Sequence, residues 1–151
     1  MKFVIQRVSS AKVEVNEEVV GEIGNGYFVL IGIEESDTTA VADKLMSKMR
    51  GLRIFSDEND KINLSLDSVE GNVLLVSQFT LYADCRKGNR PSFTKAGSPE
   101  HAEKLYNYIV EESRKALGDD RVATGVFGEH MKCSLVNEGP FTVILDSKEL
   151  L

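Results

Sequence analysis

Two helix-like segments interrupt a chain whose other ordered segments resemble strands. Apolar residues recur at helical spacing after Asp37 or Thr38, either of which can cap a helix, until Gly51. They do so again between Ser98-Pro99 and Gly118. Strand-like patterns cover residues 2–8, 12–15, 19–23, 27–33, 52–55, 72–76, 131–136 and 141–146. This order lacks regular strand–helix–strand alternation, which argues against a doubly wound parallel sheet. We predict an α+β fold, formed by a single domain over residues 1–151, in which a curled, barrel-like, mixed or mainly antiparallel sheet carries two main helices.

A Gly-Pro pair separates the last two predicted strands. Proline cannot donate a hydrogen bond to a strand ladder, so Pro140 must lie at an edge, a bulge or a turn. Gly139 can adopt backbone angles closed to other residues and allows another molecule to approach the main chain. We predict that the pair forms the stiff, exposed tip of an apolar hairpin. A plain turn accounts for the same residues.

A second short segment places polar groups at the end of a buried-type strand. The apolar run 72–76 leads directly into Ser77-Gln78-Phe79-Thr80-Leu81. Polar side chains beside irregular backbone at a strand end are a common location for a binding site. We therefore regard residues 77–80 as a candidate site.

The charge of the chain is unevenly distributed. A net charge of −6 argues against non-specific nucleic-acid binding by the whole surface. Residues 86–95 nevertheless contain four basic residues and no acidic one: Arg86, Lys87, Arg90 and Lys95. Such a loop can hold a phosphate backbone even on an acidic protein. The alternative is a solvated loop with incidental charge.

The patterns of several enzyme classes are missing. The only histidines, His101 and His130, have no second histidine or cysteine at close ligand spacing, apart from the half-site that Cys133 makes with His130. The nucleophile-elbow, phosphate-loop and dinucleotide-binding motifs do not occur. We therefore expect no metal and no cofactor, and an enzyme built on this chain would have to act on an already labile bond.

The sequence also contains few features that indicate a cellular location. Met1-Lys2 runs directly into a strand pattern, and no apolar stretch approaches the roughly 18 residues that span a bilayer. Cys85 and Cys133 are too few for a disulfide framework. These features predict a cytoplasmic protein with reduced thiols and no membrane partner.

Taken together, residues 77–81 and Asn137-Glu138-Gly139-Pro140-Phe141-Thr142 resemble the paired signatures of the D-aminoacyl-tRNA deacylase family, Ser-Gln-x-Thr-Leu and Asn-x-Gly-Pro-x-Thr. Four further segments resemble that family in the same order, so the resemblance covers essentially the whole chain: Gln6-Arg7-Val8, Arg53-Ile54-Phe55-Ser56-Asp57, Arg90-Pro91-Ser92-Phe93 and Ser134-Leu135-Val136. The resemblance implies an editing hydrolase. Such an enzyme cleaves the labile ester between a D-amino acid, or glycine, and the 3′-terminal adenosine of tRNA.

The resemblance also implies how the site is built. The Gly139-Pro140 bond would be cis, and the tip would enter the active site of a homodimer partner, where its carbonyl groups face the substrate α-carbon. Asn137 and Arg7 would hold the tip, and Met131 would flank the pocket. An ordinary ion pair is the alternative role for Arg7. The basic loop would contact the tRNA.

Residues 77–80 would line the pocket, and main-chain N–H groups near Phe79 and Thr80 would stabilise an oxyanion. A core position is the alternative for Phe79. Thr80 is the one candidate side-chain nucleophile, but no general base for it is evident. We expect Thr80 to assist or position while the terminal 2′-hydroxyl of the tRNA helps the hydrolysis. Two alternatives remain open: a non-catalytic RNA-binding barrel, and a related editing deacylase with a trans Gly-Pro bond and relaxed chirality that acts on L-alanyl-tRNA.

Overall fold

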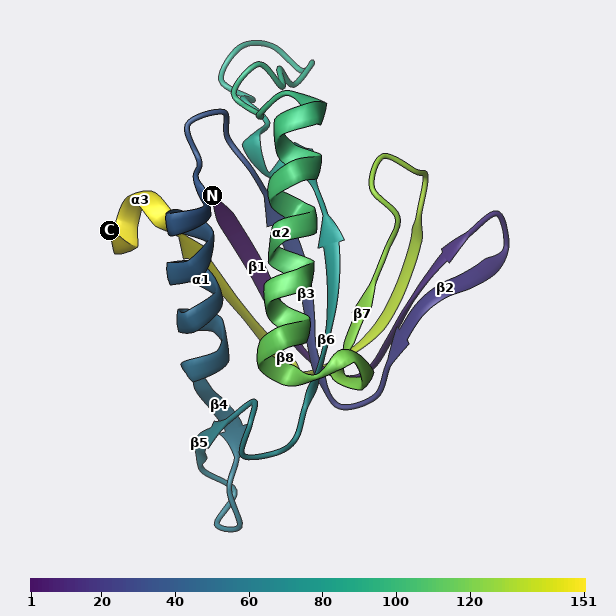
Figure 1. The fold of residues 1–151 in the computed structure, drawn as a ribbon, viewed down its shortest axis with the longest axis vertical. Coiled ribbons are helices and arrows are strands. Elements are labelled where there is room, and N and C mark those ends of the chain that lie inside the picture. The colour runs from purple at the N-terminus through teal and green to yellow at the C-terminus, as the bar shows by residue number, and fades with distance from the viewer.

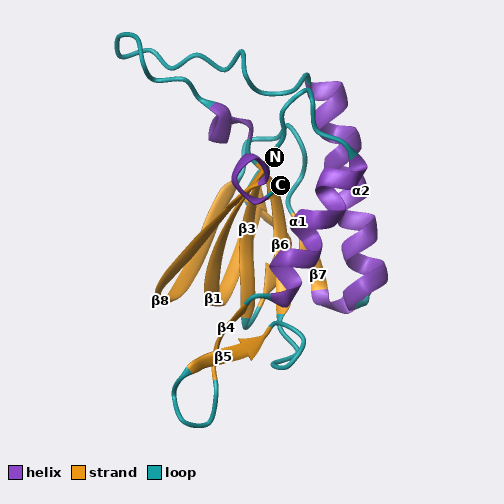
Figure 2. Ribbon diagram, turned by 90° about the vertical axis from the view of Figure 1, so that its left-hand side faces the viewer, coloured by secondary structure: helices purple, strands orange, loops and turns teal.

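The computed structural model describes residues 1–151, which form a mixed sheet covered on one face by two helices (Figures 1 and 2). In chain order the elements are β1 Lys2–Val15, β2 Glu18–Ile23, β3 Gly26–Gly32, α1 Thr39–Gly51, β4 Arg53–Ser56, β5 Ile62–Ser65, β6 Asn72–Ser77, the 3-10 turn η1 Phe79–Tyr82, α2 Pro99–Leu117, the 3-10 turn η2 Asp119–Arg121, β7 Val122–Thr124, β8 Lys132–Asp146 and α3 Ser147–Leu150. No helix combines the length and the apolar character needed to cross a bilayer.

The long strand β1 organises the sheet. β8 pairs antiparallel with β1 along one side, while β3 and then β2 pair antiparallel with it along the other. β6 continues the sheet parallel to β3, and β7 lies parallel to β6. The small hairpin of β4 and β5 forms a separate two-stranded sheet at one end of the molecule (Figure 1). The mixed sheet with its two main helices confirms the predicted fold class.

The sheet curls until its two ends meet. Gly21 in β2 lies so close to β7 that a Cβ atom there would be 2.3 Å from the carbonyl oxygen of Thr124 and 3.1 Å from Leu74 Cδ1. A residue without a side chain is needed where two backbones approach this closely. The contact explains the barrel-like form of a sheet whose ends, β2 and β7, are not hydrogen-bonded to each other.

Both faces of β6 are buried. Val73 and Leu75 belong to the large core between the sheet and the helices, whereas Leu74 and Val76 belong to a smaller core inside the curl. A strand buried on both faces needs a continuous apolar run rather than an alternating one. The run at 72–76 meets this need, and it carries the chain to Ser77 at the end of the strand.

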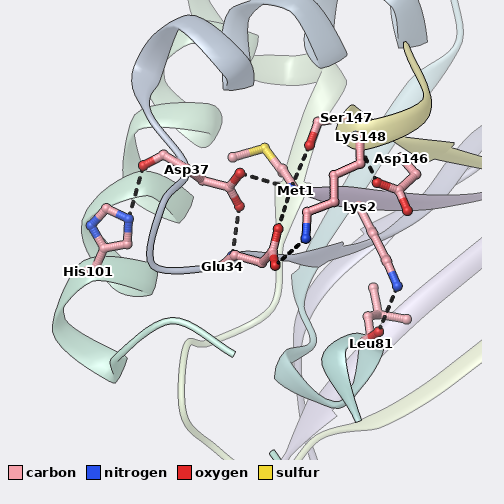
Figure 3. Close-up of polar contacts among 9 residues, drawn as sticks. All are labelled: Met1, Lys2, Glu34, Asp37, Leu81, His101, Asp146, Ser147 and Lys148. Carbon is pink, nitrogen blue, oxygen red and sulfur yellow. Dashed lines mark hydrogen bonds and ion pairs between the residues drawn. The ribbon is translucent and has the colours of Figure 1, made fainter. Parts of the chain in front are cut away.

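The helix boundaries follow their capping residues. Thr38 accepts a hydrogen bond from the Val41 N–H and caps α1, which ends at Gly51 as predicted. Ser98 caps α2 in the same way, and Gly118 ends it with a positive φ of 97°. Asp37, the other candidate cap of α1, instead accepts hydrogen bonds from the Glu34 N–H and from the amino group of Met1 (Figure 3).

The predicted hairpin at the C-terminal end is wrong. Residues 131–136 and 141–146 do not pair with each other, because both belong to β8 and both pair with β1. The register passes from Gln6–Thr142 to Val8–Asn137, so residues 138–141 form a bulge opposite Arg7. The bulge removes Pro140 from the ladder, as is expected for a residue that has no N–H group to donate. The short elements β5, β7 and α3 were not predicted.

We predict that Gly21→Ala opens this closure. Overpacking of a tight contact costs about 1–3 kcal/mol, and each kcal/mol lowers the melting temperature of a chain of this size by about 2–4 °C. Gly24→Ala is the matched control, because a Cβ atom there has no neighbour within 4 Å. Thermal unfolding measures both variants. Equal melting temperatures for the two would contradict the close approach of β2 and β7.

Candidate active site

A cavity of about 560 Å³ lies where β6 ends, between the first turn of α2 and the segment that precedes β8. Its lining is mostly apolar, with a few polar groups, as is usual for small-molecule sites. Four of the predicted site residues line it: Ser77, Gln78, Phe79 and Met131. The cavity therefore brings together the polar end of β6 and a residue from the other end of the sequence.

The end of β6 is held in place by β3. Ser77 pairs with Ile31, and the Gln78 N–H donates a hydrogen bond of 2.8 Å to the Ile31 carbonyl oxygen. The chain then turns into η1, which carries Phe79 and Thr80 at the surface. Phe79 is 56% exposed, so its alternative role as a core residue is wrong. Its ring packs edge-to-face against Phe93 at 5.1 Å, and both rings line the cavity.

Thr80 lies beside Gln78 and does not line the cavity. The Gln78 side-chain amide donates a hydrogen bond of 2.5 Å to the Thr80 hydroxyl oxygen. A general base would have to accept the hydroxyl proton instead, and neither end of an amide is basic enough to do so. This geometry favours a positioning role for Thr80 over a nucleophilic one.

The titratable side chains that line the cavity are Glu129, His130 and Cys133. Burial raises the pKa of the Cys133 thiol, so the thiol is protonated at neutral pH and is a poor nucleophile. Glu129 and His130 are exposed and make no side-chain hydrogen bond. Sequence reasoning did not place Phe93, Glu129 or His130 at a site, because only the tertiary fold brings their loops to the end of β6.

Arg7, Asn137, Gly139 and Pro140 lie away from this cavity and form the bulge and its support. Arg7 pairs with Tyr27 at the start of β3, whereas Ser77 pairs with Ile31 near its end. Four residues along a strand correspond to roughly 13 Å. The two halves of the predicted site are therefore at different ends of the sheet within one chain.

The bulge is exposed but well supported. Arg7 Nε donates to the Glu138 carbonyl oxygen at 2.9 Å, and Arg7 Nη1 donates to the Ile54 carbonyl oxygen at 2.6 Å. The Arg7 guanidinium also stacks over the Phe141 ring at 4.5 Å, and Arg7 makes no ion pair. The Phe141 N–H donates to Asn137 Oδ1 at 2.6 Å. The Gly139–Pro140 peptide bond is cis, and Gly139 has φ +151°.

The basic loop is only partly free to bind an anion. Figure 2 shows the segment between η1 and α2 projecting from the body of the molecule. Arg86 donates hydrogen bonds to Asp84 and holds the pKa of that carboxyl well below its usual range. Lys95 lies 3.6 Å from the same carboxylate. Lys87 and Arg90 have no side-chain hydrogen bond or ion pair, so they carry the unneutralised charge.

Comparison with known proteins identifies the family. The family model described as D-Tyr-tRNA(Tyr) deacylase matches residues 4–146. The chain belongs to this family. A D-aminoacyl-tRNA deacylase of Thermosipho melanesiensis is 50% identical over 150 residues, covering 99% of each chain. One of Pseudoalteromonas translucida is 54% identical over 142 residues, covering 94% of this chain and 97% of the relative.

Solved structures share the deacylase fold. A structure titled c-Myc DNA Unwinding Element Binding Protein superposes with a TM-score of 0.92 at 39% identity, covering 97% of this chain and 98% of that one. A probable eukaryotic D-amino acid tRNA deacylase superposes with a TM-score of 0.84 at 21% identity, covering 95% and 97%. The second structure, at 21% identity, is evidence for the fold alone.

We predict that neither Thr80 nor His130 performs acid–base or nucleophilic chemistry. Thr80→Ala and His130→Gln should each lower the rate of D-tyrosyl-tRNA deacylation by less than about tenfold, because removal of an acid–base group usually costs about 10²–10⁴-fold. Single-turnover kinetics with saturating protein measures the chemical step. A loss above 100-fold in either variant would make that residue a direct participant.

Proposed function

We propose that this deacylase hydrolyses the ester bond of D-aminoacyl-tRNA, and of glycyl-tRNA, and that it rejects L-aminoacyl-tRNA at a backbone wall formed by Gly139 and Pro140. The observation that carries the proposal is the separation of two complementary parts: a cavity with a polar strand end, and a rigid, exposed bulge that lies outside the same chain's cavity. The activity belongs in the cytoplasm, where tRNA is charged.

The two parts come together in a homodimer in this proposal. The bulge of one subunit enters the cavity of its partner, and the two-fold symmetry of the dimer makes both sites equivalent. The exposure of residues 138–140 and the fixed position of their backbone support this arrangement. Met131 flanks the cavity and belongs to the same subunit as the cavity.

A backbone wall distinguishes chirality by exclusion. Carbonyl groups that face the α-carbon of the substrate leave room for hydrogen but not for an L side chain, whereas a D side chain points the other way. Rejection by steric clash requires a rigid element. Arg7 and Asn137 supply that rigidity through contacts with the main chain of Glu138 and Phe141. A wall of this kind ignores side-chain identity, so the enzyme accepts many D-amino acids.

The hydrolysis itself needs little acid–base machinery. The ester is labile, and the neighbouring 2′-hydroxyl of the terminal ribose assists its cleavage. Amide groups in the first turn of a helix have no acceptor within it. In η1 these are the Phe79 and Thr80 N–H groups, which we assign to the developing oxyanion. Ser77 and Gln78 orient the reacting end of the substrate in this scheme.

Hydrolysis of D- and L-tyrosyl-tRNA by the purified protein tests the proposed function. We expect rapid release of D-tyrosine and no measurable release of L-tyrosine. Release of neither amino acid would favour a non-catalytic RNA-binding barrel, whereas cleavage of L-alanyl-tRNA would favour the deacylase with relaxed chirality. Sedimentation at micromolar concentration should give about twice the chain mass of 16.7 kDa. An active monomer would contradict the shared site.

Gly139→Ala tests the wall itself. A side chain is rarely tolerated at φ +151°, and a Cβ atom would lie 2.8 Å from the Phe141 nitrogen, so the bulge must shift. We expect the ratio of D to L deacylation rates to fall at least tenfold. Glu138→Ala is the matched control, because Arg7 contacts only the main-chain carbonyl of that residue. Unchanged chiral selection in Gly139→Ala would contradict the wall.

The basic loop is proposed to bind the tRNA backbone through Lys87 and Arg90, with Arg86 and Lys95 contributing less because they share Asp84. Each lost phosphate contact reduces the slope of log affinity against log salt by about 0.7–0.9. Changing Lys87 and Arg90 to alanine should therefore weaken tRNA binding and flatten its salt dependence. Alanine at the exposed Lys48 and Lys61 gives the same change in net charge as a control. Equal slopes for both double variants would show that the loop does not contact tRNA.

A further inference from the structure

The turn that carries Phe79 and Thr80 packs directly on the end of β3. A Cβ atom at Gly32 would lie 2.9 Å from Leu81 Cβ and 3.2 Å from Tyr82 Cε2. Gly32 therefore leaves the space that the second half of η1 fills. Its partner across the β1–β3 ladder is Lys2, so the Lys2 side chain projects from the same face of the sheet as the one that η1 covers.

Lys2 contacts the second half of η1 in two ways. Its ammonium group donates a long hydrogen bond of 3.4 Å to the Leu81 carbonyl oxygen, as Figure 3 shows. The same group lies 4.8 Å from the centroid of the Tyr82 ring. Carbonyl groups at the end of a helix lack a partner within it, and a cation is favourable there. Lys2 makes no ion pair, so its charge is directed to the turn.

Tyr82 is buried and held mainly by its ring. The residue is 5% exposed, and its hydroxyl group lies near the Glu34 carboxylate without a hydrogen bond within 3.5 Å. Burial first, and then the nearby carboxylates of Glu34, Asp37 and Asp146, raise the pKa of Tyr82, so the phenol is neutral. Packing on Gly32 and the contact with Lys2 remain as the interactions that fix the ring.

The main chain at Lys2 is itself fixed by its neighbours. The Ser147 N–H donates to the Met1 carbonyl oxygen at 2.9 Å, and Lys2 pairs with Asp146 of β8 as well as with Gly32. Lys148 forms an ion pair with Glu34 at 3.0 Å beside them (Figure 3). Lys2 therefore reaches η1 from a backbone that is held on both sides.

We propose that Lys2 is a positioning residue for the active-site turn. It holds Leu81 and Tyr82 so that the two residues before them keep their places, Phe79 in the cavity lining and Thr80 beside Gln78. Lys2 does not line the cavity and touches no substrate in this proposal. The inference rests on the proposed function, because the turn matters for catalysis only if the cavity at the end of β6 is the active site.

Three variants test the role of Lys2 in D-tyrosyl-tRNA deacylation. Lys2→Met keeps the length of the side chain and removes its charge. It should lower kcat about tenfold, which is about 1.4 kcal/mol of barrier, with KM changed less than about twofold. Lys2→Arg restores the cation and should recover at least half of the lost kcat. Lys12→Met on the same strand is the control, since Lys12 contacts Glu14 and not the turn.

Substitution of Tyr82 provides a second, independent test of the proposal. Tyr82→Leu removes the ring that packs on Gly32 and faces Lys2, so it should show the same loss as Lys2→Met. Melting temperatures are measured for every variant. Wild-type kcat in Lys2→Met, or a loss that Lys2→Arg fails to recover, would overturn the proposal. An inactive wild-type protein would instead refute the proposed function, so the two failures are distinguishable.

Discussion

β8 pairs with β1 along nearly its whole length, and its register shifts opposite Arg7 and again at Ser9. Most of the site follows from the irregularity opposite Arg7. The four residues that do not fit the ladder leave it as a bulge, and the arginine that they face is free to bind their main chain. The same guanidinium reaches the Ile54 carbonyl oxygen, so β4 is tied to the bulge as well. An exposed loop thereby acquires the fixed backbone that a selective wall requires.

The distribution of the candidate site over the sheet is the reason for the proposed dimer. The cavity forms where β6 ends, at the far end of β3 from Arg7. One chain therefore carries the cavity at one end of the sheet and the rigid bulge at the other. Two such chains, related by a two-fold axis, can complete each other's sites. In the proposed dimer, the backbone of one subunit excludes L side chains while the other subunit holds the ester, and neither task demands a strong nucleophile.

Local signals in the sequence predicted the parts of the fold that depend on local chemistry. Thr38, Ser98 and Gly118 are residue types that favour helix ends, and they cap α1 and α2 here. The apolar run at 72–76 is typical of a strand buried on both faces, as β6 is. The same patterns could not show that residues 131–136 and 141–146 pair with a third strand, because strand periodicity carries no information about the partner. Asp84 lies just outside the basic segment, so its neutralisation of Arg86 became visible only in the folded loop. Ser77, Gln78 and Phe79 of the predicted site line the cavity and Thr80 does not, whereas Phe93 and His130 join it solely through tertiary structure.

Complementation between two defective variants tests the shared site most directly. Ala96→Trp fills the cavity and leaves the bulge intact, whereas Gly139→Ala distorts the bulge and leaves the cavity intact. Ala96→Trp alone should deacylate D-tyrosyl-tRNA poorly, whereas Gly139→Ala alone should show a ratio of D to L rates at least tenfold below that of the wild type. When the two are unfolded together in equal amounts and refolded, half of the dimers are mixed, and differently tagged subunits allow these to be isolated. Each mixed dimer has one intact composite site, so it should show about half of the wild-type rate on D-tyrosyl-tRNA together with the wild-type ratio of D to L rates. Mixed dimers no more selective than Gly139→Ala would contradict the account.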